Sequence, residues 1–361
     1  MRVKIFGAGS IGNHLSNAAR SLGWEVDICD ISNDALERTK NLIYPSRYKK
    51  WDEKIGLYLN HEAPKGIYDL IFIGTPPKFH IPLAIEALKE NPQGILIEKP
   101  LCTPDLNGAD DLVAFSEDKN IPVYVGYDHT LAESTQLFLS KCISNEDIVW
   151  ETLDVQFREH WGGIFNAHPW LNGPGDSYLG YSELGGGSTC EHSHALNLWQ
   201  YFSQVLGKGQ IVEVQAMMDF FVEDKVKYDK CAFFNLKTEK NFTGRVVQDV
   251  ITKPSSKKAR IQSGDAYLEW LCSYKENSDL VTNNINSEME EIVFKKSRPE
   301  DFIVELKHIQ NNLNYKEISP ISLRNGLNTM LVIGAGFLSN KIKKNVFIDY
   351  SVGYNYKAFS Y

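Results

Sequence analysis

The sequence predicts an α/β protein: an N-terminal domain with a doubly wound parallel sheet, followed by a C-terminal α+β domain with a large, mainly antiparallel open sheet. Over about the first 125 residues, short apolar runs alternate with helical patterns, which is typical of a parallel sheet covered on both faces. Longer runs that alternate apolar and polar residues follow, which indicates antiparallel strands with one packed face. The length of 361 residues suits two domains.

The N-terminal domain is expected to cover residues 1–127. Its two clearest helical patterns are Ile11–Leu22 and Ile81–Leu88, where apolar residues recur on one face of a 3.6-residue period. Six short apolar runs predict its strands, at residues 3–6, 26–29, 42–44, 70–73, 95–97 and 123–125.

The C-terminal domain is expected to cover residues 128–361, with the alternative that its final helix and tail pack back on the first domain. Residues 274–301 are polar and are interpreted as a mobile excursion, with a short edge strand at Ile292–Phe294; Lys253–Arg260 is interpreted as a solvated turn. Strands are expected at 149–157, 211–221, 228–236, 242–251 and 266–272, and helices at about 188–205, 302–313 and 322–341.

Composition excludes several classes of function. Lys and Arg total 38 against 46 Asp and Glu, a net charge of −8, which argues against a nucleic-acid partner. No apolar run approaches the roughly 18 residues of a membrane span. The six cysteines form no CxxC pair and are expected to be buried thiols. The sequence enters a strand at once, without room for a cleavable signal, so a cytoplasmic location is expected.

A glycine-rich turn predicts a nucleotide site. Gly7-Ala-Gly9-Ser-Ile-Gly12 follows a strand and opens an amphipathic helix, the context that gives this motif its meaning. Gly7 permits the tight turn, Gly9 lets a pyrophosphate approach the backbone, and Gly12 lets the helix pack closely on the strand. The alternative is a purely structural turn.

Asp30 indicates which dinucleotide is bound. It ends the second predicted strand, 18 residues after Gly12, where a carboxylate accepts both ribose hydroxyls and repels a 2′-phosphate. The expected cofactor is therefore NAD, and NADP is less favoured. The alternative is that Asp30 caps the Ser32-Asn33 turn.

Three further segments carry a resemblance to a known family: the run Gly74–His80 (GTPPKFH), the run Glu98–Leu101 (EKPL), and Gly185–Gly187 followed by an acid and a histidine. They closely resemble the glucose-fructose oxidoreductase / inositol dehydrogenase (Gfo/Idh/MocA) family, from Arg2 to about Tyr350. The resemblance implies a Rossmann N-terminal domain, a cis peptide before Pro100, and a homodimer or homotetramer formed through the exposed face of the second sheet.

Lys99 is the predicted centre of the chemistry. Oxidation of an alcohol needs a hydride acceptor, a base for the hydroxyl proton and a positive charge near the developing alkoxide. Lys99 follows a parallel strand at its carboxyl end, where doubly wound folds bind ligands, so its ammonium is expected to hold the reacting oxygen. The alternative is a solvated charge paired with Glu98.

The predicted base departs from the family's spacing. Members place an Asp four residues before the catalytic His, whereas Glu191 precedes His194 by three. We expect His194 to accept the proton and Glu191 to bind or orient the substrate. Three alternatives stay open: Ser188 and Glu191 form a capping box, His194 is a core histidine, or His192 is the reactive one. No metal is expected.

The loop of residues 157–184 is expected to bind the substrate, because five of its aromatic residues, interleaved with Gly and Pro, suit the C–H faces of a sugar: Trp161, Phe165, Trp170, Tyr178 and Tyr181. The alternative is a small core that pins the loop, or a subunit contact. The substrate-binding residues are expected to be Lys99, Trp161, His168, Trp170, Glu191 and His194. The cofactor-binding residues are expected to be Gly7, Gly9, Ser10, Ile11, Gly12, Asp30, Thr75, Pro76, His80, Glu98 and Lys99.

These observations predict an NAD-dependent oxidoreductase that acts on a hydroxyl of a sugar, sugar derivative or cyclitol. Two alternatives stay open on the same fold. One is a glycosidase that oxidises and then re-reduces its sugar through NAD, and the other is a non-catalytic sugar or NAD sensor. A sensor has no need of Lys99 and His194 together, and both are present.

Overall fold

A computed structural model describes residues 1–361 except 167, 276, 287, 297–298 and 314–318. The chain forms two compact units. The first contains residues 1–102, 108–128 and 298–326, and the second contains residues 103–107, 129–297 and 327–361. The predicted boundary after residue 127 lies next to one of these divisions, but the sequence had placed all of 128–361 in the second domain.

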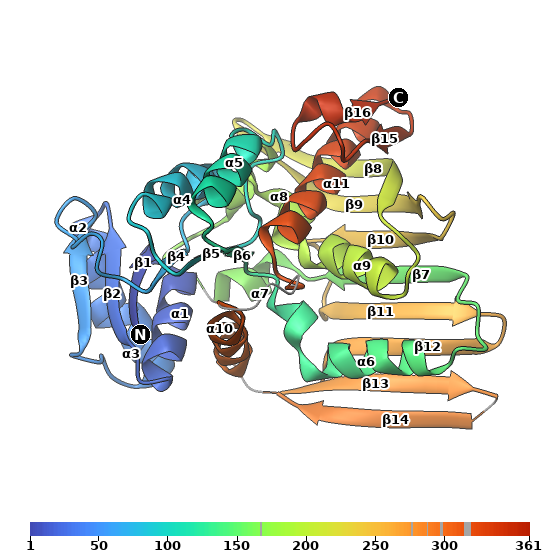
Figure 1. The fold of residues 1–361 in the computed structure, drawn as a ribbon, viewed down its shortest axis with the longest axis horizontal. Coiled ribbons are helices and arrows are strands. Elements are labelled where there is room, and N and C mark those ends of the chain that lie inside the picture. The colour runs from blue at the N-terminus through green and yellow to red at the C-terminus, as the bar shows by residue number, and fades with distance from the viewer. Residues whose placement is uncertain (167, 276, 287, 297–298, 314–318) are drawn as a thin grey trace. The chain divides into compact units, whose positions relative to one another are not determined.

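The first unit is built on a six-stranded parallel sheet in the order β3-β2-β1-β4-β5-β6, the doubly wound arrangement that the sequence predicts (Figure 1). Its strands are β1 (Arg2–Phe6), β2 (Glu25–Asp30), β3 (Ile55–Leu59), β4 (Leu70–Ile73), β5 (Gly94–Ile97) and β6 (Val123–Val125). Its helices are α1 (Ser10–Ser21), α2 (Asn33–Arg38), α3 (Tyr44–Tyr48), α4 (His80–Leu88), α5 (Ala109–Lys119) and α10 (Glu300–Asn312).

One predicted strand of this unit is wrong. Residues 42–44 lie in a turn of π-helix, Thr39–Ile43, and at the start of α3, and the third strand of the chain is β3. Leu42 is exposed whereas Ile43 and Tyr44 are buried, so the apolar triplet packs as a helix packs, with one face inward.

Helix α10 belongs to the first unit, although its sequence lies among the residues of the second. Phe302, Leu306 and Ile309 are buried at intervals of three to four residues, and the Phe302 ring stacks on His14 of α1 with the centroids 5.0 Å apart. Burying side chains of this size contributes about 1.5–3 kcal/mol each as an upper estimate, which explains why α10 packs here.

The second unit is built on a ten-stranded sheet in the order β14-β13-β12-β11-β7-β10-β9-β8-β15-β16, in which β7 and β10 form the parallel pair. Its strands are β7 (Thr152–Arg158), β8 (Ile211–Glu223), β9 (Val226–Thr238), β10 (Thr243–Asp249), β11 (Ser256–Ser263), β12 (Ala266–Lys275), β13 (Ser278–Ile285), β14 (Glu288–Lys295), β15 (Val346–Ile348) and β16 (Phe359–Ser360). Its helices are α6 (Glu133–Ser144), α7 (Trp161–Asn166), α8 (Gly187–Glu191), α9 (His194–Val205) and α11 (Leu323–Ile342), the last beginning in the first unit.

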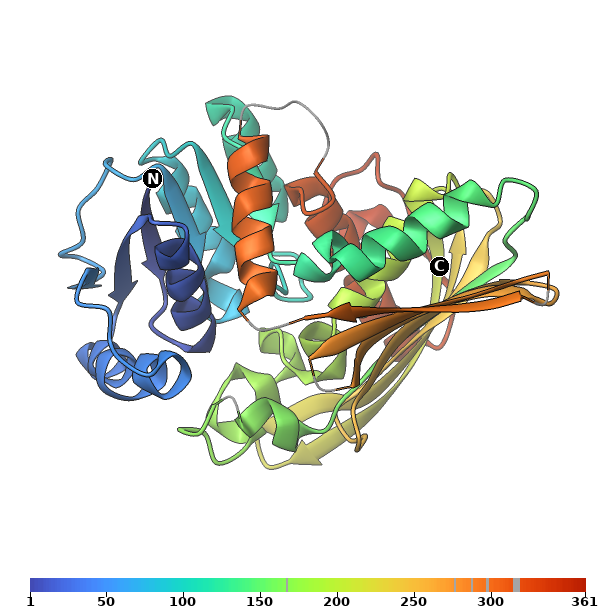
Figure 2. The same ribbon diagram turned by 90° about the horizontal axis from the view of Figure 1, so that it is seen from below.

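Strand β7 shows how this sheet separates its two faces. Leu153, Val155 and Phe157 are buried, and the residues between them are partly exposed, as the period of two in a strand requires. Helices α6, α9 and α11 lie in front of the strands in Figure 1, and Figure 2 shows α6 along one side of the sheet. Trp199 of α9 and Trp270 of β12 are fully buried in this core.

Two expectations for this unit are corrected. The segment expected to be a mobile excursion forms the hairpin of β13 and β14 at the edge of the sheet, although 276, 287 and 297–298 lie outside the described residues. The predicted edge strand lies within β14. The segment expected to be a solvated turn leads into β11, which pairs with β7 and β12.

All six cysteines are buried free thiols, as predicted. Among the described residues, every helix is too short or too polar to cross a bilayer.

Candidate functional site

The glycine-rich turn brings three backbone segments of the first unit into contact. Gly7 has a φ of +104°, and a Cβ there would lie 2.6 Å from the carbonyl oxygen of Gly74 after β4. A Cβ on Gly12 would lie 1.9 Å from the carbonyl oxygen of Gly7. A Cβ on Gly9 would meet nothing within 4 Å. Gly7 and Gly12 are therefore required by packing, whereas Gly9 borders open space.

The groups around this space suit an anionic ligand. Gly9 is the N-cap of α1 and offers no side-chain cap, so the N–H groups of the first turn, Ser10 and Ile11 included, are available to a phosphate. The Thr75 hydroxyl, just after β4, is buried without a hydrogen-bond partner among the described residues. The expected cofactor contacts thus lie where a dinucleotide would satisfy them.

Asp30 is the last residue of β2, and its carboxylate also stabilises the glycine-rich turn. Its Oδ2 accepts a hydrogen bond from the N–H of Ala8 at 2.8 Å, and its Oδ1 accepts from the N–H of Ser32 at 2.9 Å. The turn-capping interpretation is thus correct, and it is compatible with ribose binding because an ionised carboxylate has about four acceptor positions.

His80 does not contact open space, contrary to the expectation that it binds the cofactor directly. The residue is 1% exposed, with Nε2 2.6 Å from the carbonyl oxygen of Thr75 and Nδ1 3.0 Å from that of Pro100. Burial lowers the pKa of His80 to about 4, because the interior disfavours the charged imidazolium. The ring lies between the Thr75 loop and the turn that follows Lys99, and the neutral form donates to one of the two carbonyl oxygens at a time.

Lys99 follows β5 and is half-buried. Its backbone N–H donates to Glu98 Oε2 at 3.3 Å, and the Lys99-Pro100 peptide is cis, as the resemblance implies. Glu98 is buried, and a Cβ on Gly126 would approach both of its carboxylate oxygens to 3.0 Å. Because β2, β4 and β5 are parallel, Lys99 after β5 lies at the same carboxyl edge of the sheet as Asp30 at the end of β2 and Thr75 after β4.

In the second unit, Asp229 of β9 positions the start of α8. The carboxylate accepts from the hydroxyls of Ser182, Ser188 and Thr189 and from the N–H of Thr189, all at 2.7–2.8 Å. The fully buried Asp229 has a raised pKa, because desolvation outweighs these hydrogen bonds. A Cβ on Gly187 would lie 2.1 Å from Asp229 Oδ1, which explains a glycine at that position.

This arrangement excludes the capping box proposed for Ser188 and Glu191. The N-cap of α8 is Gly186, so Ser188 lies inside the helix and its hydroxyl is bound to Asp229. The carboxylate at the start of α8 comes from Asp229 on β9, 40–41 residues further along the chain than Ser188 and Thr189. The sequence around Ser188 therefore gives no indication that Asp229 binds there.

The helix expected over 188–205 is broken between Glu191 and His194. Helix α8 ends at Glu191, His192 is its C-cap, and α9 begins at His194. The buried Gln248 amide of β10 donates to the carbonyl oxygens of His192, at 2.6 Å, and Thr189, at 3.2 Å. Glu191 and His194 thus flank a turn and do not share one continuous helical face.

The break separates the two candidate histidines by exposure. His192 is 3% exposed, whereas His194 and Glu191 are half-buried. The His194 ring meets that of His129 edge to face, with centroids 4.6 Å apart, and both lie near the Phe157 ring. His194 is accordingly the more accessible base, and His129 is a neighbour that the sequence analysis missed.

The aromatic loop divides into a core part and an accessible part. Trp161 is 7% exposed and packs with Ile164, Leu179, Tyr228 and Val250, which favours the alternative that it belongs to a small core holding the loop in place. His168 and Trp170 are partly exposed, with ring centroids 5.3 Å apart. These two remain predicted substrate contacts.

Comparisons with known proteins identify a family for the first unit. Residues 1–127, about a third of the chain, match a family described as "Oxidoreductase family, NAD-binding Rossmann fold" (GFO_IDH_MocA). No curated protein sequence matches the chain.

Several solved structures share the fold. A levoglucosan dehydrogenase in complex with NADH has a TM-score of 0.78 at 13% identity, covering 97% of this chain and 99% of that one. The WlbA dehydrogenase of Bordetella pertussis, in complex with NADH and UDP-GlcNAcA, has a TM-score of 0.71 at 16% identity, covering 96% and 98%. An aldose-aldose oxidoreductase of Caulobacter crescentus, complexed with glycerol, has a TM-score of 0.75 at 14% identity, covering 96% and 99%.

The glycines of the turn make a matched pair for a binding test. Gly9→Ala should leave the thermal stability unchanged because its Cβ meets no atom, yet weaken NAD⁺ binding because the pyrophosphate must approach that backbone. Gly12→Ala should lower stability by several kcal/mol through its clash with the Gly7 carbonyl. Melting curves and calorimetric titration measure both effects, and undiminished NAD⁺ affinity in Gly9→Ala would contradict the assigned site.

The buried His80 predicts a pH dependence of stability. Its folded pKa of about 4 lies below the ordinary 6.5, so the unfolded chain binds a proton first as the pH falls. The contribution is present in full above pH 6.5 and decreases by about 3 kcal/mol as the pH falls towards 4. Urea denaturation between pH 7 and 4 should show a shallower decrease for His80→Gln than for the unaltered chain, and equal slopes would refute the assignment.

Proposed function

We propose that this chain is an NAD-dependent dehydrogenase that acts on a CH–OH group of a sugar, sugar derivative or cyclitol, because residues 1–127 match the model of the NAD-binding oxidoreductase family GFO_IDH_MocA. The observation that carries the proposal is the shared sheet edge of the first unit. The open Gly9 backbone, the buried Thr75 hydroxyl and Lys99 all lie there. The structural relatives crystallised with NADH and sugar-like ligands support the substrate class.

Asp30 supports NAD as the cofactor rather than NADP. Its two oxygens are fixed by the N–H groups of Ala8 and Ser32, so the carboxylate has a defined orientation at the end of β2. A carboxylate held there accepts ribose hydroxyls and repels a 2′-phosphate. Gly9, Ser10 and Ile11 would hold the pyrophosphate, with Thr75 and Pro76 beside the cofactor.

The reaction divides between three side chains. The Lys99 ammonium binds the hydroxyl oxygen and stabilises the negative charge that develops on it. His194 accepts the hydroxyl proton, and Glu191 orients the substrate or the imidazole. The bound NAD⁺ supplies the acceptor for the hydride, which leaves the carbon with its electron pair as the C=O bond forms.

One experiment separates the proposed dehydrogenase from the two alternatives. The purified chain is incubated with NAD⁺ and a panel of free sugars, inositols and glycosides, while NADH and hydrolysis products are followed together. A dehydrogenase forms NADH in proportion to the oxidised product. A glycosidase that uses NAD transiently forms hydrolysis products without net NADH, and a sensor binds ligand and forms neither.

Lys99→Ala should lower kcat by two orders of magnitude or more, because alkoxide stabilisation is lost. Lys78→Ala is the matched control. It removes the same charge, and Lys78 is exposed in the neighbouring segment after β4. Turnover by Lys99→Ala at the level of the control would refute the assigned role.

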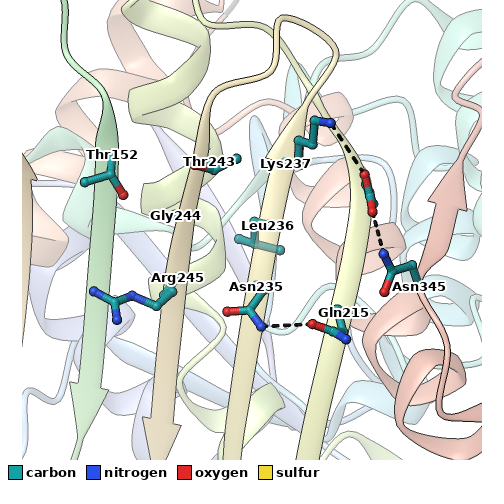
Figure 3. A pocket seen from close by; sticks show the side chains of 10 residues that line it. Thr152, Gln215, Asn235, Leu236, Lys237, Thr243, Gly244, Arg245 and Asn345 are labelled. Atoms are coloured by element: carbon teal, nitrogen blue, oxygen red, sulfur yellow. Dashed lines mark hydrogen bonds and ion pairs between the residues drawn. The ribbon is translucent and has the colours of Figure 1, made fainter.

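The open face of the second sheet is the proposed contact between subunits. Met217 and Phe233 lie opposite each other on β8 and β9 and are 63% and 41% exposed. Beside them is a shallow, mainly polar hollow of about 350 Å³, in which Asn235 donates to Gln215 (Figure 3). An apolar pair beside such a hollow suits a self-complementary interface. Sedimentation velocity should give a dimer or tetramer that Met217→Glu weakens, and a monomer at all concentrations would refute this.

A further inference from the structure

The segment of residues 39–48, predicted in part as a strand, is fastened to the glycine-rich turn and to α1. The Thr39 hydroxyl donates to the carbonyl oxygen of Ala8. The Asn17 amide donates to the Tyr44 hydroxyl at 3.3 Å, and the Tyr48 hydroxyl lies 2.7 Å from Nδ1 of His14. A π-helical turn precedes α3 here, and such turns frequently occur at functional sites.

This fastening brings Arg47 to the first turn of α1. Its Nη1 donates to the carbonyl oxygen of Ser10 and its Nη2 donates to the Ser10 hydroxyl, both at 2.8 Å. Ser10 is the first residue of α1 and is 7% exposed. The planar guanidinium is thus fixed by two parallel hydrogen bonds beside the turn proposed to bind the cofactor.

The position is electrostatically unfavourable for a cation in isolation. The N-terminus of a helix carries a partial positive charge, so a nearby Arg is repelled and an anion is attracted. Helix α1 has no acidic residue in its first turn, and its own Arg20 lies in the last turn, where a cation is favoured. Arg47 instead lies beside the first turn of α1, where it is bonded to Ser10.

The space beside Gly9 is open to a ligand. A Cβ on Gly9 would touch nothing within 4 Å, and the Thr75 hydroxyl offers a buried donor without a partner among the described residues. Guanidinium groups bind phosphate oxygens through paired, charge-assisted hydrogen bonds. The expected ligand is therefore a phosphate ester that reaches the first turn of α1.

We propose that Arg47 binds the pyrophosphate of the dinucleotide, across the first turn of α1 from the Gly9 backbone. The proposal rests on the proposed function, because it names a residue of the same cofactor site. Arg47 then neutralises the diphosphate charge, while Asp30, which is bonded to the Ala8 N–H at the base of the turn, selects the adenosine ribose.

The test uses the full chain and calorimetric titration with NAD⁺, ADP-ribose, adenosine and NADP⁺. Arg47→Met should raise the Kd for NAD⁺ and ADP-ribose about tenfold or more, the loss expected for a charge-assisted hydrogen bond, and leave adenosine binding unchanged. The salt dependence of NAD⁺ binding should weaken as well. Lys50→Met, three residues away and exposed, removes the same charge and should stay within twofold of the unaltered chain.

Each other outcome overturns the proposal. An unchanged Kd for NAD⁺ in Arg47→Met removes Arg47 from the site. A loss confined to NADP⁺ places the guanidinium at a 2′-phosphate instead, and an equal loss for adenosine shows a structural role. Failure of the unaltered chain to bind NAD⁺ refutes the proposed function itself. If Arg47→Met does not fold, as judged by its melting curve, Arg47→Gln, which removes the charge but keeps an amide donor for Ser10, carries the same comparison.

Discussion

Direct backbone contact among three glycines is the constraint on which the first unit depends. Gly7 follows β1, Gly12 lies in the first turn of α1, and Gly74 follows β4. A Cβ on Gly7 or Gly12 would lie 1.9–2.6 Å from a carbonyl oxygen. No other residue allows α1 to approach β1 this closely. Because the strands are parallel, the residues that follow β2, β4 and β5 then reach the same edge as the helix N-terminus, and the cofactor site follows from that packing.

The second unit meets a similar requirement by a different route. Its helix α8 also begins against a close backbone contact, since Gly186 and Gly187 leave no room for side chains. Here the N–H of Thr189 in the first turn, together with its hydroxyl, donates to the buried carboxylate of Asp229. The first turn of α8 already binds a carboxylate and does not offer that N–H to a phosphate. The first turn of α1 borders open space at Gly9. The two glycine-rich turns therefore differ in function although they look alike in sequence.

The limits of sequence-based prediction have specific causes in this chain. Strands β1, β2, β4, β5 and β6 were predicted because their buried runs are continuous and apolar. Strand β11 was missed because Lys257, Lys258 and Arg260 conceal the alternation of the buried Ala259 and Ile261. Its register comes from pairing with β7 and β12. Arg47, His129 and Asp229 were missed because each meets its partner across 37 or more residues of sequence, and no local pattern encodes such contacts.

Residues 298–326 belong to the first unit, so a fragment that contains only the N-terminal residues lacks part of this unit. The parallel sheet ends at β6, where Val125 N–H donates to the carbonyl oxygen of Ile321, and Tyr124 bridges to Ser322. Helix α10 covers α1 through Phe302 and His14. A fragment that ends at residue 127 would expose both the edge of β6 and this face of α1 to water, at a cost of several buried side chains. The nucleotide site is therefore a property of the full chain, even though its motifs lie within the first hundred residues.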